Sequence, residues 1–112
     1  MSSLGDRERA FDSSLEQDEE LKFRLAARRN RLLGEWAASK MGLSDVETDS
    51  YTKDVIRADF EETGDEVVIR KILGDLTAAG VETDDVEIRR ALENNAFEAR
   101  RQLIEAHGAA GA

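Results

Sequence analysis

The sequence feature with the clearest chemical use is a cluster of arginines that precedes the single tryptophan. Arg28, Arg29 and Arg31 lie within four residues, and Trp36 follows shortly after them. Guanidinium groups bind phosphates through paired hydrogen bonds, and an indole ring offers a flat face on which a base can stack. This pattern makes Arg28, Arg29 and Trp36 the candidate nucleotide-binding residues. The alternative is structural: the arginines pair with acids of a neighbouring helix, and Trp36 anchors the core.

Residues suited to catalysis or metal binding are scarce. The chain has one histidine, His107, and no cysteine. A histidine-based triad, thiolate chemistry and Cys- or His-rich metal sites are therefore not expected. The glycines are isolated and form no phosphate-binding loop. We expect a protein that acts by binding, with no catalytic residue, no metal and no required cofactor.

Acidic residues outnumber basic ones, and their distribution is uneven. The 112 residues include 25 Asp and Glu against 16 Lys and Arg, which gives a formal net charge of -9. This balance argues against binding to nucleic acid or to anionic membranes. No apolar run is long enough for a membrane span, so we expect a chain that stays in the cytoplasm and does not insert into a membrane.

Residues 21–42 carry six basic residues and one acid, whereas residues 43–66 carry nine acids and two bases. Neighbouring helices of opposite charge are the simplest explanation, and Asp59 is predicted to face an arginine of the first helix.

Hydrophobic residues recur at helical spacing through most of the chain, which contains no proline. The pattern predicts four helices, at residues 15–41, 44–63, 65–80 and 83–107. Gly42 is expected to end the first helix, Ser44 and Glu47 to form a capping box, and Thr83 to cap the fourth. The predicted fold is all-α: an antiparallel four-helix bundle over residues 15–107, followed by a frayed tail at 108–112.

Two details of the expected packing can be checked in the structure. Phe23 and Phe60 are expected on the inward faces of the first two helices. Gly34 and Gly74 lie in similar segments, RLLGEWAA and KILGDLTA, and each is expected to mark a close helix crossing because glycine otherwise weakens a helix.

The first 14 residues lack a dense apolar stripe and are expected to be disordered in the free protein. Leu4, Phe11 and Leu15 would nevertheless share one face of a helix, which suits a segment that folds in a partner's groove. An inert solvated tail is the alternative interpretation.

Several short motifs, in order over residues 6–90, resemble those of the zeta subunit family, the alpha-proteobacterial inhibitors of the rotary ATP synthase. The most specific of them is the segment ARRNRLLGEWAA, and the other matches are Asp6-Arg7-Glu8, Ala58-Asp59-Phe60-Glu61, Gly64-Asp65-Glu66, Arg70-Lys71 and Ala78-Ala79-Gly80-Val81.

The resemblance implies an inhibitory, non-enzymatic subunit with a mobile N-terminal arm over residues 1–14. In the family the arm folds between the catalytic subunits and the rotor stalk and blocks ATP hydrolysis, and the bundle binds ADP or ATP. Carried over to this sequence, the arm's contact residues are Leu4, Asp6, Arg7, Glu8, Phe11 and Leu15. The chain would be peripheral to the inner membrane when bound to the synthase and monomeric when free. The alternative is a nucleotide-responsive helical sensor or adaptor unrelated to the synthase.

Overall fold

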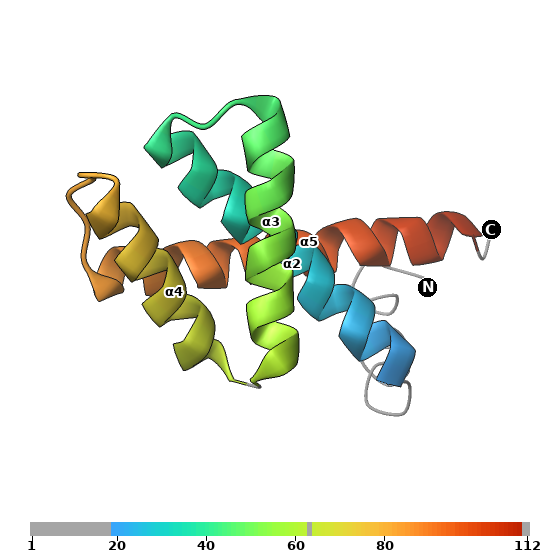
Figure 1. The fold of residues 1–112 in the computed structure, drawn as a ribbon. Helices are drawn as coiled ribbons and strands as arrows, with labels where there is room; N and C mark the ends of the chain where they lie inside the picture. Colours follow the sequence, from blue (N-terminus) through green and yellow to red (C-terminus); the bar gives the residue numbers. More distant parts are fainter. Residues whose placement is uncertain (1–18, 63, 111–112) are drawn as a thin grey trace.

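The computed structural model describes residues 19–62 and 64–110, with the backbone alone for residues 107–110. It contains four helices, α2 (Glu19–Met41), α3 (Asp45–Glu61), α4 (Asp65–Ala78) and α5 (Asp85–Ala110), joined by short turns (Figure 1). No strand occurs in the described part of the chain, and the predicted all-α four-helix fold is confirmed. The predicted arm and Leu15 lie outside the described residues. Helix α5 reaches Ala110, so the backbone of residues 108–110, which was expected to fray, is helical.

Helix α2 is the centre of the arrangement. It packs against α3, α4 and α5, whereas α3 and α5 do not contact each other. In Figure 1, α3 runs across the direction of α5 rather than along it. Because its two neighbours diverge, α2 has a surface channel on each side, one toward α3 and one toward α5.

The predicted end of α2 at Met41 is correct, whereas α3 and α4 end before the predicted residues 63 and 80, and α5 extends past residue 107. The predicted start of the first helix at residue 15 lies outside the described residues. The capping box forms: the N–H of Glu47 donates to Ser44 Oγ at 3.2 Å, and the N–H of Ser44 donates to Glu47 Oε1 at 2.9 Å. Gly42 follows α2 with φ 71°, in the left-handed region where glycine has no steric penalty. The fourth helix is capped one residue later than expected, because Asp84, and not Thr83, accepts the N–H of Glu87 at 2.9 Å.

One core lies between all four helices. Its buried members come mainly from α2, α4 and α5: Leu33, Ala37, Val55, Val68, Ile69, Ile72, Leu76, Ile88, Ala91 and Leu92. The inward placement of Phe23 and Phe60 was wrong, since they are 52% and 71% exposed. Their rings contact each other edge to face instead, with centroids 5.8 Å apart across the channel between α2 and α3.

The two similar glycine-containing segments are used differently. A Cβ built on Gly34 would lie 3.1 Å from both Cα and Cγ2 of Thr52, so α2 and α3 cross closely at this point as predicted. A Cβ on Gly74 would meet nothing within 4 Å, so the same prediction for Gly74 was wrong.

Candidate functional site

Arg29 is held in a network of polar groups that joins three helices. Its Nη1 donates to Asp65 Oδ1 at 2.8 Å, and its Nε and Nη2 donate to Asn30 Oδ1 at 3.1 Å. Asn30, only 1% exposed, donates from Nδ2 to Asp59 Oδ2 at 2.9 Å. Asp59 Oδ2 also lies 3.7 Å from Arg29 Nη2, which confirms the predicted pairing of Asp59 with an arginine of the first helix. The network fixes the Arg29 guanidinium, because each charged group that leaves water needs a partner.

The other two candidate nucleotide-binding residues lie away from this network. Arg28 Nη1 donates to Gln102 Oε1 on α5 at 3.0 Å, on the exposed surface. Trp36 packs half-buried against the core, with Lys40 Nζ 5.1 Å from its ring centroid. Seven residues of helix separate Trp36 from Arg29, a rise of about 10 Å. The structure therefore places Arg28, Arg29 and Trp36 in three different surroundings.

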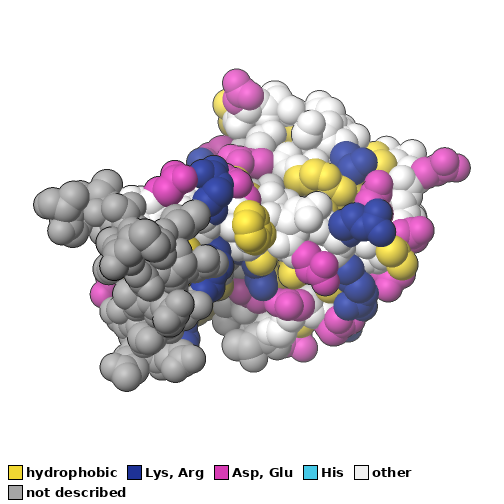
Figure 2. All heavy atoms as spheres, turned by 180° about the vertical axis from the view of Figure 1, so that it is seen from behind, with side chains coloured by type: hydrophobic (Ala, Val, Ile, Leu, Met, Phe, Trp, Pro, Cys, Tyr) yellow, Lys and Arg dark blue, Asp and Glu magenta, His cyan; other side chains and the backbone are white. Residues whose placement is uncertain are grey.

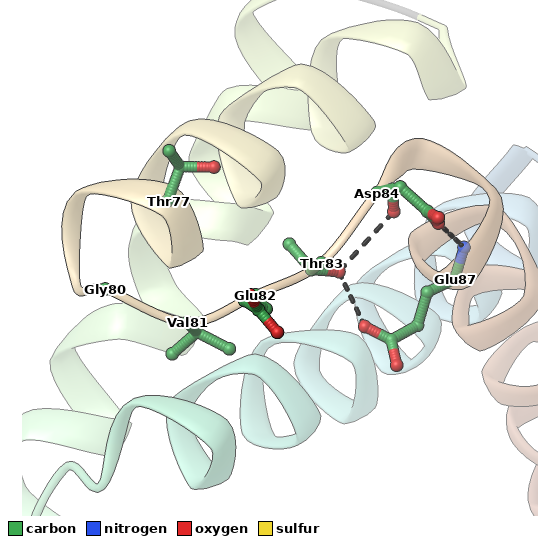
Figure 3. Close-up of a pocket in the computed structure, with 7 residues that line it drawn as sticks. All are labelled: Thr77, Gly80, Val81, Glu82, Thr83, Asp84 and Glu87. Carbon is green, nitrogen blue, oxygen red and sulfur yellow. Dashed lines mark hydrogen bonds between the residues drawn. The ribbon is translucent and has the colours of Figure 1, made fainter.

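The largest of three surface hollows described in the structure lies at the connection between α4 and α5. It measures about 720 Å³ and is lined by Thr77, Gly80, Val81, Glu82, Thr83, Asp84 and Glu87 (Figure 3). Its charged groups are carboxylates. Thr83 Oγ1 donates to Glu87 Oε1 at 2.6 Å, and the carboxylate of Glu87 lies 3.6 Å from Lys40 Nζ. A phosphate would meet negative charge here, so this hollow does not suit a nucleotide.

A second hollow, of about 360 Å³, lies between α2 and α5, and we call it the basic hollow. Its lining consists of Lys22, Leu25, Ala26, Arg29, Ala96, Phe97 and Arg100. Arg29 is thus the one sequence-based candidate that lines it. Lys22, Phe97 and Arg100 were not predicted, since only the packing of α2 on α5 brings residues so distant in the chain together.

A third hollow, of about 240 Å³, occupies the channel between α2 and α3. Phe23 and Phe60 form its rim, and Asn30 and Asp59 contribute polar groups. Among the described residues that line it, none is a lysine or arginine. On the face shown in Figure 2, basic and acidic side chains interleave, and exposed hydrophobic side chains form small separate patches.

The shifted pKa values in this structure arise from hydrogen bonds and burial within the fold. Hydrogen bonds from Arg89 lower the pKa of Glu66, and those from Arg101 and Gln102 lower the pKa of Glu98. Burial and a hydrogen bond to Asp75 raise the pKa of Tyr51. None of these groups lines the basic hollow.

Within residues 19–62 and 64–110, no cluster of three or more histidine, cysteine or acidic residues is arranged to hold a metal ion. Across the same residues, no helix has the length and apolar character that a membrane crossing requires.

Comparison with known proteins defines the class more closely. The family model of the ATPase inhibitor subunit zeta matches residues 1–102, and the chain belongs to this family. A solved structure titled "Solution NMR structure of the protein" is similar, with 40% identity and a TM-score of 0.67. The match covers 77% of this chain and 98% of that one. No curated protein matches. The family is one of regulatory proteins that inhibit an ATPase, and the predicted family membership is confirmed.

Proposed function

We propose that this protein blocks ATP hydrolysis by the catalytic head of an alpha-proteobacterial ATP synthase. Its N-terminal segment folds between the catalytic subunits and the rotor stalk. The free chain is a cytoplasmic monomer that becomes peripheral to the inner membrane when it binds the synthase.

The observation that carries this proposal is the extent of the family match. The match begins at residue 1 and includes the segment that precedes α2, whereas the four helices of residues 19–110 already enclose a core. We therefore assign the contact with the synthase to the segment that precedes α2. Folding on the partner costs about 2–5 kcal/mol of ordering. Burial of Leu4, Phe11 and Leu15 and polar contacts of Asp6, Arg7 and Glu8 would offset that cost.

Removal of residues 1–14 tests this mechanism. The ATPase rate of the purified catalytic head would be measured with the full chain, with the N-terminally truncated chain, and with a control that lacks residues 108–112. The N-terminal truncation should abolish inhibition while circular dichroism shows an unchanged helical bundle, and the control should inhibit normally. Inhibition by the chain that lacks residues 1–14 would contradict the mechanism.

The proposal includes binding of ADP or ATP by the bundle. Arg29 supports it, because this guanidinium is fixed by Asn30 and lines the basic hollow. Titration with ATP, followed through the backbone amide shifts, locates the site. Arg28 and Trp36 are retained as sequence-based candidates if shifts also appear there, and shifts that avoid α2 would remove all three residues from the proposal.

A nucleotide-responsive sensor unrelated to the synthase is the second candidate, since a ligand hollow alone would also serve that role. Purification of the tagged chain from its cell distinguishes the two. An inhibitor is recovered with the catalytic head of the synthase, and a free sensor is recovered without it.

A further inference from the structure

The first part of α2, residues 19–29, lies outside the core, and we call it the outer part of α2. None of residues 19–29 is buried, whereas Asn30 is 1% exposed and the buried face of α2 continues from there to Ala38. In Figure 1 this blue part of the helix extends away from the place where α2 passes α3. At 1.5 Å per residue it is about 16 Å long. Residues 1–18 are joined to its free end, so its direction determines where that segment begins.

A group of polar side chains fixes the inner end of the outer part, and we call Arg29, Asn30, Asp59 and Asp65 the polar network. Arg29 donates to Asp65 at the start of α4 and to Asn30, which in turn donates to Asp59 on α3. The side chains of Arg29 and Asp59 are only 15% and 18% exposed. Removal of one member would leave a half-buried charge without its partner, so the network holds the inner end against two other helices.

Two contacts hold the outer part nearer to its free end. Phe23 meets Phe60 of α3 edge to face, and Arg28 donates to Gln102 of α5 at 3.0 Å. Hollows lie on both sides of this part of the helix, so it is packed incompletely against α3 and α5. A helix of this length is only marginally stable by itself in water. Its direction therefore depends on the polar network and on these two contacts, because the core does not reach it.

We propose that the polar network and the contact of Phe23 with Phe60 set the direction in which α2 presents the N-terminal segment to the synthase. The inference rests on the proposed function and names the positioning residues on which presentation of the segment depends. A tilt of about 20° at Asn30 would move the free end of the outer part by about 5 Å, close to one helical turn. A fixed direction also reduces the freedom that is lost when the segment binds.

Distances measured by pulsed electron paramagnetic resonance in the free, full chain test the positioning. The sequence contains no cysteine, so spin labels attach only where cysteines are introduced. The pair Glu19→Cys and Glu93→Cys connects the free end of the outer part to α5, and the pair Arg70→Cys and Glu93→Cys is a control between α4 and α5. With Asn30→Leu or Phe60→Ala, the first pair should show a broader distance distribution and the control pair an unchanged one. Unchanged distributions for the first pair in both variants would overturn the inference.

Inhibition of the purified catalytic head tests the consequence for function. Asn30→Leu and Phe60→Ala should each raise the concentration needed for half-inhibition by about ten-fold, because the segment then starts from a less defined direction. Ile88→Val weakens the core outside the polar network, and Val46→Ala trims an exposed side chain at the other end of α3. Both controls should inhibit like the unaltered chain. Thermal unfolding verifies that each variant folds, and Phe60, which is 71% exposed, provides a test even if Asn30→Leu does not fold.

The possible failures have different meanings. If the unaltered chain does not inhibit the catalytic head, the proposed function is wrong and this inference fails with it. If the unaltered chain inhibits and the folded Asn30 and Phe60 variants inhibit equally well, the proposed function stands and the positioning role is wrong. If Ile88→Val weakens inhibition as much as they do, the effect reflects general stability, which also contradicts a positioning role.

Discussion

The two mid-helix glycines should respond in opposite directions to the same substitution. Alanine in place of a helical glycine stabilises the helix by about 1 kcal/mol. At Gly74 the added methyl group meets nothing within 4 Å, so Gly74→Ala should raise the free energy of unfolding by most of that amount. At Gly34 the methyl group would lie 3.1 Å from two carbons of Thr52, one of which belongs to the backbone of α3.

The close contact that a methyl group on Gly34 would make is costly to relieve, because it involves the backbone of α3 at Thr52. Thr52 is 2% exposed, and its hydroxyl donates to the carbonyl of Asp49 at 2.8 Å, so the residue cannot move without α3. Overpacking of this kind costs about 1–3 kcal/mol. After the helix gain is subtracted, Gly34→Ala should lower the free energy of unfolding by up to about 2 kcal/mol.

Urea unfolding followed by circular dichroism measures both effects, with unchanged m-values as the check that the end states are the same. Thr52→Ser gives a matched background, since it removes Cγ2 and keeps the hydroxyl. Gly34→Ala should cost less in that background, while the contact with Thr52 Cα prevents full rescue. If Gly34→Ala stabilises the chain as much as Gly74→Ala does, then α2 and α3 do not cross as closely as the structure shows.

Two further predictions concern polar contacts. Tyr51→Phe removes a 2.7 Å hydrogen bond to Asp75 and should cost about 1 kcal/mol in urea unfolding; an unchanged midpoint would contradict it. Because the pKa of Tyr51 is raised on folding, the unfolded chain loses this proton first, so stability should fall as the pH rises above about 10, and less so in the Phe variant. Ser44→Ala should cost about 1 kcal/mol through loss of the cap. It should leave the pKa of Glu47 lowered in an NMR titration, because alanine keeps the backbone N–H that donates to Glu47 Oε1 and is the larger cause of the shift; a full return to the ordinary pKa would contradict this assignment.

Local signals in the sequence predict the elements of this fold well. The capping box at Ser44 and the glycine after α2 depend on neighbouring residues only, and both are where the pattern places them. Packing between distant residues is harder to predict. Phe23 and Phe60 have helical spacing suited to the core, yet both lie at the surface, where their rings contact each other.

In the candidate site, too, local sequence signals predict some residues, whereas others come together only through packing. The opposite charges of neighbouring helices predict that Asp59 pairs with an arginine of the first helix, and the structure shows that this arginine is Arg29. Phe97 and Arg100 lie about seventy residues further along, and no local motif connects them to α2. Trp36 is only seven positions from Arg29 in the sequence, but the helix places the two residues about 10 Å apart along its axis.

The net charge is compatible with a phosphate ligand once distance is considered. At physiological ionic strength, charges further apart than about 8 Å are largely screened from each other. The cations that line the basic hollow would act on a bound phosphate at contact distance, in competition with the acids already paired with Arg29 and Lys22. A long polyanion such as nucleic acid would meet the other acids of the chain as well. The charge of -9 therefore argues against nucleic acid and leaves a small phosphate ligand possible, whose affinity should fall as salt is added.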